Sequence, residues 1–112
     1  VVKHRDHVEP VPCPCGSSTR IITRQDTPVA GLHVTHIRDS QKHFHQKTTE
    51  IYYILEGKGW LEIGEDKVEL TPGTTVLIRP GTPHRGYGDF TTIVVPVPAF
   101  DPDDEFLFNP VA

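Results

Sequence analysis

The sequence predicts an all-β fold of the sandwich or barrel class. Short segments rich in Val, Ile, Thr and Tyr recur along the chain, and Gly, Pro or Asp separates most of them. Helical periodicity is almost absent. Many short strands divided by turn residues are typical of sandwiches and barrels. We expect the 112 residues to form one domain, 1–112.

The expected strands follow one another closely along the chain: 20–23, 32–37, 43–46, 51–56, 59–63, 66–70, 75–79, 84–87 and 91–97. Residues 64–66, Gly-Glu-Asp, are expected to form a hairpin loop between WLEI and KVEL. Residues 71–73, Thr-Pro-Gly, place Pro and Gly for a tight turn. The barrel core is therefore expected at about 20–98, between an N-terminal segment, 1–19, and a C-terminal tail, 99–112.

The tail carries the one clear helix signal. Asp101 suits an N-cap, Pro102 suits the first helical position, and acidic residues fill the first turn. We therefore expect a short C-terminal helical turn. Phe106 and Phe108 are expected to pack on the domain or on a partner.

Composition excludes several classes of function. A formal charge of −4 and a pI near 5.9 give no basic footprint for nucleic acid. No apolar run approaches the roughly 18 residues that a membrane span needs. The first ten residues lack the apolar core of a signal peptide, so we expect a cytoplasmic location and no membrane partner.

Cys13 and Cys15 are separated by one proline. A ring closed over one intervening residue is a poor disulfide, so we expect two reduced thiols. Redox chemistry or contact with a metal are the alternatives for this pair.

Four side chains form a candidate metal-binding set. His43 and His45 are spaced to place both imidazoles on one face of a strand. Glu50 follows an expected bend at 46–49, and His84 comes from a later segment after a Pro-Gly turn. Three imidazoles and one carboxylate suit divalent Fe, Mn, Ni, Cu or Zn better than Ca or Mg.

Both stretches resemble the two signature motifs of the cupin superfamily. In that family the first motif supplies two His and a Glu, and the second supplies one His. His43, His45, Glu50 and His84 match these ligand positions. The glycine that closes the first motif is matched at 57, and the opening and turn glycines of the second at 73 and 81. Ile37, Arg79 and Gly88 depart from the motifs, but none of them is a ligand position. The resemblance implies a small antiparallel jelly-roll barrel, a double-stranded β-helix, with the metal inside one end.

The resemblance also suggests which residues surround the metal. If Glu50 points inward, Tyr52 shares its face and is a candidate acid, base or hydrogen-bond donor. Arg79 is a candidate to hold an anion near His84, although a solvent-facing arginine is the commoner role at a strand end. His33 and His36 point to opposite faces of one strand, so one of them is expected near the interior.

Fold alone does not choose the chemistry. The leading hypothesis is a metal-dependent enzyme of the oxygenase type acting on a small organic acid or phenolic compound. The alternatives are a non-redox isomerase or lyase acting on a sugar or keto acid, and a metal-containing module that binds a small ligand. Small cupins resemble one another in forming dimers, and an exposed sheet edge needs cover, so we expect a homodimer.

Overall fold

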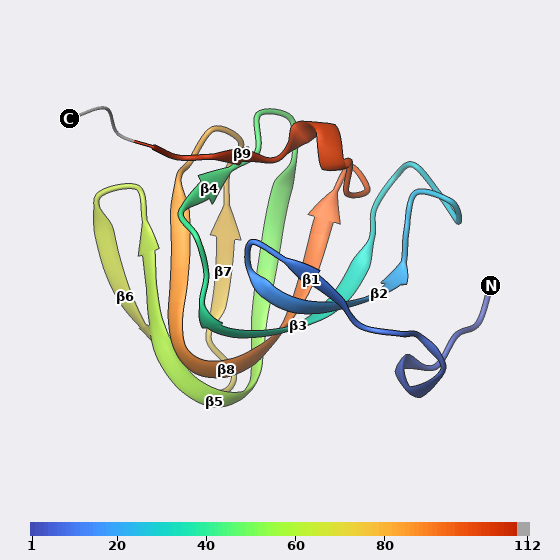
Figure 1. Ribbon diagram of the computed structural model, residues 1–112, viewed down its shortest axis with the longest axis horizontal. Helices are drawn as coiled ribbons and strands as arrows, with labels where there is room; N and C mark the ends of the chain where they lie inside the picture. The colour runs from blue at the N-terminus through green and yellow to red at the C-terminus, as the bar shows by residue number, and fades with distance from the viewer. Residues whose placement is uncertain (110–112) are drawn as a thin grey trace.

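The computed structural model describes residues 1–109. These residues form one curled antiparallel sheet (Figure 1). The helical parts are two short 3₁₀ turns, η1 (Arg5–His7) and η2 (Pro102–Asp104). The strands are β1 (Val11–Cys13), β2 (Gly16–Ile22), β3 (Leu32–Asp39), β4 (His43–Phe44), β5 (Thr49–Ile63), β6 (Asp66–Leu70), β7 (Thr75–Ile78), β8 (His84–Val97) and β9 (Phe106–Leu107). The all-β prediction is thus confirmed.

Two long strands form the centre of the sheet. β5 pairs with β8 from Thr49 opposite Val97 to Ile63 opposite His84. The sequence prediction broke each of them into two strands, which is wrong. A Cβ on Gly57 would overlap the carbonyl oxygen of Asp89, so glycine lets the two strands bend together at close approach.

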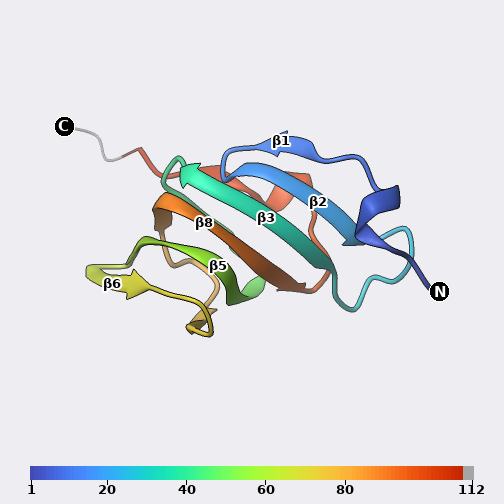
Figure 2. The same cartoon turned by 90° about the horizontal axis from the view of Figure 1, so that it is seen from below.

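The remaining strands extend this centre on both sides. β3 pairs with β8, β2 with β3, and β1 with β2. On the other side β6 and β7 each pair with β5. Figure 2 shows the sheet curling from β6 and β5 through β8 to β3, β2 and β1. The curl turns one face of the sheet inward.

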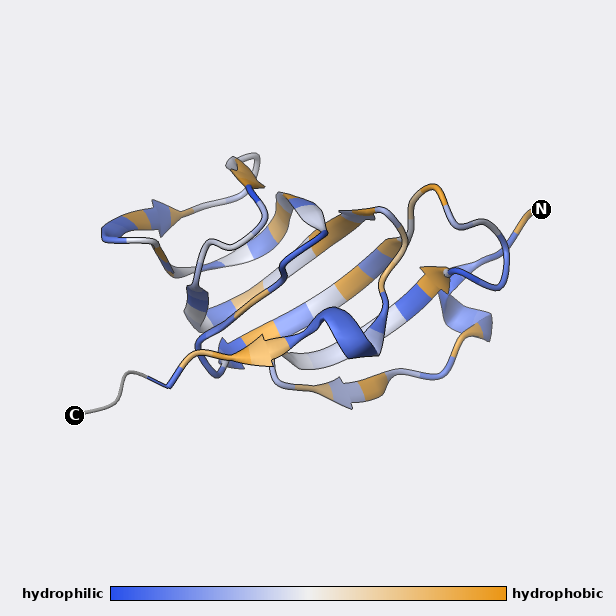
Figure 3. Ribbon diagram, turned by 90° about the horizontal axis from the view of Figure 1, so that it is seen from above, coloured by the Kyte–Doolittle hydropathy of each residue, from blue (hydrophilic) through white to orange (hydrophobic). Residues whose placement is uncertain are grey.

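The inward face holds the core. Hydrophobic and hydrophilic residues alternate along the central strands (Figure 3), as strands with one buried face require. Ile54 and Tyr52 are buried beside Glu50, whereas Tyr53 and Leu55 are exposed. The expected inward parity of Glu50 and Tyr52 is confirmed. The buried cluster is Ile37, Tyr52, Ile54, Leu61, Leu70, Ile78, Phe90 and Val94.

The expected turns are present, with small differences. Gly64 and Glu65 form the turn between β5 and β6, and Asp66 is already the first residue of β6. Gly73 has a positive φ of 91°, which suits glycine in the turn after β6. β4 is shorter than expected, because its pairing with β8 and β9 ends at Phe44.

The prediction of two reduced cysteines is contradicted. β1 and β2 form a tight hairpin, with Cys13 opposite Gly16, and a disulfide joins Cys13 to Cys15. The hairpin brings the two Cα atoms to 5.0 Å, which lies within the range of ordinary disulfides despite the short separation.

The tail forms the expected helical turn. The Asp101 side chain accepts a hydrogen bond from the backbone N–H of Asp103 at 2.9 Å, with Pro102 following the cap. Beyond this turn Phe106 stacks on Phe44, with ring centroids 5.4 Å apart. Neither 3₁₀ turn has the length or apolar character of a membrane-spanning helix.

Candidate metal centre

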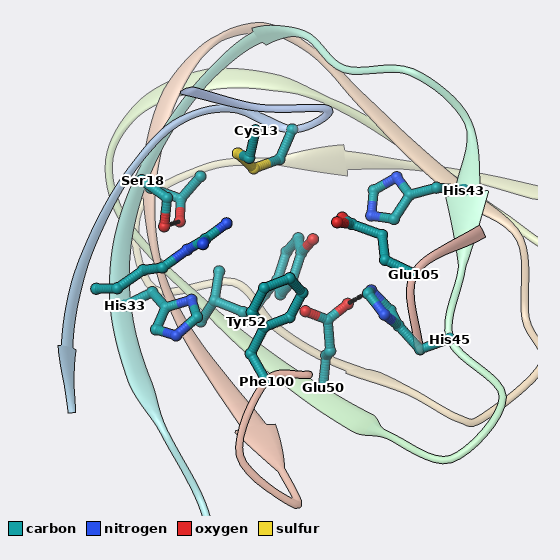
Figure 4. Close-up of a pocket in the computed structure, with 13 residues that line it drawn as sticks. Cys13, Ser18, His33, His43, His45, Glu50, Tyr52, Phe100 and Glu105 are labelled. Carbon is teal, nitrogen blue, oxygen red and sulfur yellow. Dashed lines mark hydrogen bonds and ion pairs between the residues drawn. A yellow bond between two sulfur atoms is a disulfide. The ribbon is translucent and has the colours of Figure 1, made fainter. Parts of the chain in front are cut away.

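The four predicted ligands converge. One ligand atom from each of His43, His45, Glu50 and His84 lies within 4.8 Å of the others, and all four residues are buried. Strand pairing accounts for much of this, because His43 on β4 lies directly opposite His84 at the start of β8. Glu50 comes from β5 and His45 from the residue after Phe44. Figure 4 shows His43, His45 and Glu50 facing one cavity.

Backbone carbonyls hold the three imidazoles in place. The Nδ1 atoms of His43, His45 and His84 bond to the carbonyl oxygens of Gln41, Asp104 and Thr82 at 2.8, 2.8 and 2.9 Å. A carbonyl only accepts, so each Nδ1 carries the proton. The Nε2 atoms of His45 and His84 each lie 3.2 Å from Glu50 Oε1. In neutral imidazoles the Nε2 lone pairs are thus free for a metal.

The donor set fits a divalent transition metal. Glu50 Oε1 and His84 Nε2 are buried and make no hydrogen bond of acceptable geometry. Buried polar atoms without partners are rare and costly. A cation held between these nitrogens and this oxygen would satisfy both atoms. Three nitrogens and one carboxylate oxygen suit Fe, Mn, Ni, Cu or Zn.

Electrostatics agree with a ligand role. Burial, aided by nearby His84, lowers the pKa of His43 to about 4, so this imidazole is neutral at pH 7. Burial alone would raise the pKa of Glu50, but His45 and His84 outweigh it and leave the pKa below its usual value. Burial lowers the pKa of His45, but Glu50 more than compensates and the net shift is upward. The His45–Glu50 pair thus favours a bound positive charge, and a metal cation can take the place of the proton.

Asp104 holds the loop that carries His45. Its carboxylate accepts hydrogen bonds from the backbone N–H groups of Gln46 and Lys47 and from the Thr48 hydroxyl, at 3.0 to 3.2 Å. Its own carbonyl oxygen accepts from His45 Nδ1. These donors lower the pKa of Asp104, although burial opposes them. The C-terminal turn η2 therefore positions a candidate ligand.

The candidate ligands His43, His45 and Glu50 line a cavity that opens to solvent. Tyr52 also lines it, and burial raises the pKa of this phenol well above its usual value, so the hydroxyl keeps its proton. His33 is the member of the His33–His36 pair that faces this cavity. Burial, with a contribution from Arg20, lowers its pKa to about 4.

The other two predicted residues lie away from the cavity. His36 is partly exposed and bonds to Asp89 at 2.6 Å. Arg79 is exposed in the turn before His84 and does not line the cavity.

The sequence profile of the cupin domain family matches residues 33–95, more than half of the chain. The chain belongs to this family. The profile spans all four candidate ligands. The resemblance found in the two motifs is thus confirmed, and with it the fold class.

Relatives of this cupin show the same fold. A crystal structure of a protein from Planctomyces limnophilus has a TM-score of 0.90 and 29% identity, and the match covers 96% of each chain. Pac13 from Streptomyces, a nucleoside dehydratase, has a TM-score of 0.83 and 17% identity over 100% of this chain and 93% of Pac13.

A curated sequence relative is the uncharacterized protein MJ1618 of Methanocaldococcus jannaschii. The two are 46% identical over 43 residues, which is 38% of this chain. The match spans about a third of the length of MJ1618, namely 34%.

The cavity residues of this cupin that sequence reasoning missed include Arg20 on β2, and Phe100 and Glu105 on either side of η2. Burial raises the pKa of Glu105, while the charges of His45 and Arg20 oppose the shift. Arg20 lies two residues after the buried Ser18 on β2 and so shares its face of the strand, and that parity was the only signal for it. No local pattern marks Phe100 or Glu105, because the fold of the tail brings them back to the barrel.

Proposed function

We propose that this cupin is a metal-dependent enzyme that moves a proton on a small organic acid or hydroxy-carbonyl compound, as an isomerase or lyase does. One observation carries this proposal: the candidate metal ligands share a single cavity with the protonatable side chains of Glu105 and Tyr52. A site that only held a structural metal would have no need of these groups.

His43, His45, Glu50 and His84 would hold the metal. When bound, a divalent ion supplies Lewis-acid polarisation of a substrate oxygen, which acidifies the neighbouring C–H or activates a leaving group. The net positive charge of such a site favours anionic oxygen donors.

Glu105 is suited to the proton transfer itself. Its carboxyl group points into the cavity (Figure 4), and burial raises its pKa toward the working range of a general acid or base. Tyr52 keeps its proton and can donate a hydrogen bond to a substrate oxygen. His33 is neutral and can accept or donate one hydrogen bond. Pac13 shares the fold and is a dehydratase, and loss of water requires proton transfer of this kind.

Deuterium exchange tests this function directly. The metal-reconstituted protein is incubated in D₂O with small hydroxy acids, keto acids and sugars, and mass spectrometry follows C–H exchange and loss of water. We expect exchange or elimination with at least one class, without consumption of dioxygen, and its loss in Glu105→Gln. Exchange that is unchanged in Glu105→Gln would contradict the role of this residue.

The oxygenase predicted from sequence is the second candidate. The N₃O ligand set favours it, because such sets suit redox-active iron as well as zinc or nickel. Dioxygen uptake by the iron-loaded protein with small organic acids or phenolics separates the two enzymes. A ligand that copurifies unchanged, with neither exchange nor uptake, would instead favour a binding module.

Two further predictions accompany this proposal. Arg79 lies outside the cavity lining, so any role of this residue in anion binding would be at the rim of the cavity.

A homodimer stays a prediction, supported by the exposed apolar side chains of Tyr53, Leu55 and Leu77 on the outer face of β5 and β7. Light scattering at micromolar concentration tests it, and a monomeric mass would contradict it.

A further inference from the structure

Arg20 is a half-buried cation that makes no ion pair with the described residues. Its Nε atom is buried and makes no hydrogen bond. None of the ion pairs within residues 1–109 includes it. A buried N–H donor without an acceptor is costly, and a ligand that accepts this hydrogen bond would remove the cost. Arg20 lines the same cavity as the candidate metal ligands.

The surrounding residues fix the direction of this side chain. The guanidinium carbon lies 4.5 Å from the centroid of the Phe100 ring, a distance at which the cation and the ring attract each other. The pairing of β2 with β3 shifts register between Arg20 and Ile22. Such irregularities re-aim side chains near functional sites. The guanidinium is thus held in place, with donors still free.

The neighbours of Arg20 on β2 and β3 that line the cavity are neutral polar groups. His33 lies directly opposite Arg20 on β3 and is neutral. One step along the wall, the buried hydroxyls of Ser18 and Thr35 bond to each other at 3.1 Å. All three residues line the cavity with Arg20. A carboxylate beside Arg20 would meet hydrogen-bond donors, and Glu105, which lines the same cavity, forms no ion pair with Arg20.

We propose that Arg20 anchors a carboxylate of the substrate, so that the substrate is a small hydroxy or keto acid with a second carboxylate. This inference rests on the proposed function, because one end of the molecule is placed at the metal. The charges support it: a divalent ion and Arg20 outweigh the carboxylates of Glu50 and Glu105, so the cavity is net positive and favours an anionic substrate. The Nε and Nη donors of arginine match a carboxylate side-on.

Calorimetric titration of zinc-loaded protein with malate and with lactate tests the anchor. Both acids carry the same hydroxy-carboxylate end, and malate alone has the second carboxylate. We expect malate to bind wild type at least about tenfold more tightly than lactate. Arg20→Gln should bring malate down to the affinity of lactate and change lactate less than about twofold. Arg38→Gln, which alters an arginine that is 75% exposed on β3, should change neither.

A second variant, Arg20→Lys, tests the anchor in case Arg20→Gln does not fold. Arg20→Lys keeps the charge but loses the side-on pair of donors, so malate affinity should fall by severalfold. Full retention of the malate preference in either folded variant would overturn the anchor.

Zinc content, measured before each titration, separates failure of the anchor from failure of the proposed function. Wild type that takes up none of iron, manganese, nickel, copper and zinc would overturn the proposed metal chemistry. The anchor is then tested on metal-free protein, where succinate should shift the amide resonances of residues 19–21 and 33 in wild type and not in Arg20→Gln. Full zinc occupancy without a malate preference would overturn the anchor alone.

Discussion

Two walls of one cavity differ in how their polar groups are satisfied. The metal wall consists of His43, His45, Glu50 and His84, and the β2–β3 wall consists of Ser18, Arg20, His33 and Thr35. Each histidine of the metal wall is fixed through Nδ1 by a backbone carbonyl. On the β2–β3 wall the hydroxyls bond to each other, and Arg20 Nε has no partner. Figure 4 shows Ser18 and His33 across the cavity from His43 and His45.

The difference indicates that one wall binds the metal whatever the substrate and that the other wall recognises one class of substrate. Backbone carbonyls hold a ligand set regardless of which substrate arrives, so the metal wall can serve many reactions. Side chains left without partners can be satisfied by one class of ligand and are poorly satisfied by others. We infer that the metal wall provides the chemistry and that the β2–β3 wall selects the substrate.

The largest effect is expected at the metal wall. His45→Ala removes one nitrogen ligand and should strip nearly all metal while the barrel stays folded, because Asp104 still holds the loop through Gln46 and Lys47. Elemental analysis gives the metal content, and circular dichroism checks the fold. His36→Ala, at an exposed histidine, is the control. Full occupancy in His45→Ala would mean that the ligand assignment is wrong.

A variant next to the metal wall should separate catalysis from metal binding. Glu105→Gln keeps the shape of the side chain and removes its ionisation, so turnover should fall about 10²- to 10⁴-fold with metal content unchanged. The rate of deuterium exchange and elemental analysis measure the two quantities. Glu65→Gln, in the exposed turn between β5 and β6, is the matched control. Equal loss of metal and rate would place Glu105 among the ligands instead.

A smaller effect is expected from the support of the metal wall. Asp104→Ala removes the carboxylate that binds the loop at 46–48 and should lower the free energy of unfolding by about 3 kcal/mol. Thermal and urea denaturation of the metal-free protein measure this loss. Asp103→Ala, at the exposed neighbour, should cost far less. Equal costs for the two would show that the loop does not depend on Asp104.

The smallest effect concerns pH and the β2–β3 wall. His33 has a pKa of about 4 in the fold and 6.5 as its ordinary value, so the unfolded chain binds the proton first. The contribution of neutral His33 to the free energy of unfolding is complete above pH 6.5 and is lost as the pH falls toward 4. Between pH 7 and pH 5 the loss should be about 1 to 2 kcal/mol.

His33→Gln should remove that part of the pH dependence, as measured by urea denaturation of metal-free protein at both pH values. His43 titrates in the same direction, so the difference between wild type and variant isolates His33. His36→Gln provides the control on the same strand. An unchanged slope in His33→Gln would mean that His33 is not held neutral.

The sequence predicted the metal wall because local patterns carry it. The H-x-H spacing, the following glutamate and the Pro-Gly turn before His84 are short-range features. The same holds for the inward parity of Tyr52 and for the helical turn after Asp101.

The other wall and parts of the fold depend on contacts between distant segments. Gly57 and Gly59 look like a strand break in the sequence, but they allow β5 to bend past β8. Arg20 and Glu105 reach the cavity only after β2 pairs with β3 and the tail returns to the barrel. The Cys13–Cys15 disulfide depends on the hairpin of β1 and β2, most of which lies in the N-terminal segment, 1–19, where no strand was expected. The cytoplasmic location stays a prediction.

Metal stoichiometry is the most direct test of the central claim that this cavity is a metal centre. The purified protein is stripped with a chelator, reconstituted separately with iron, manganese, nickel, copper and zinc, desalted and subjected to elemental analysis. The convergence of His43, His45, Glu50 and His84 predicts close to one ion per chain for at least one of these metals. No retained metal in any of the five reconstitutions would contradict it.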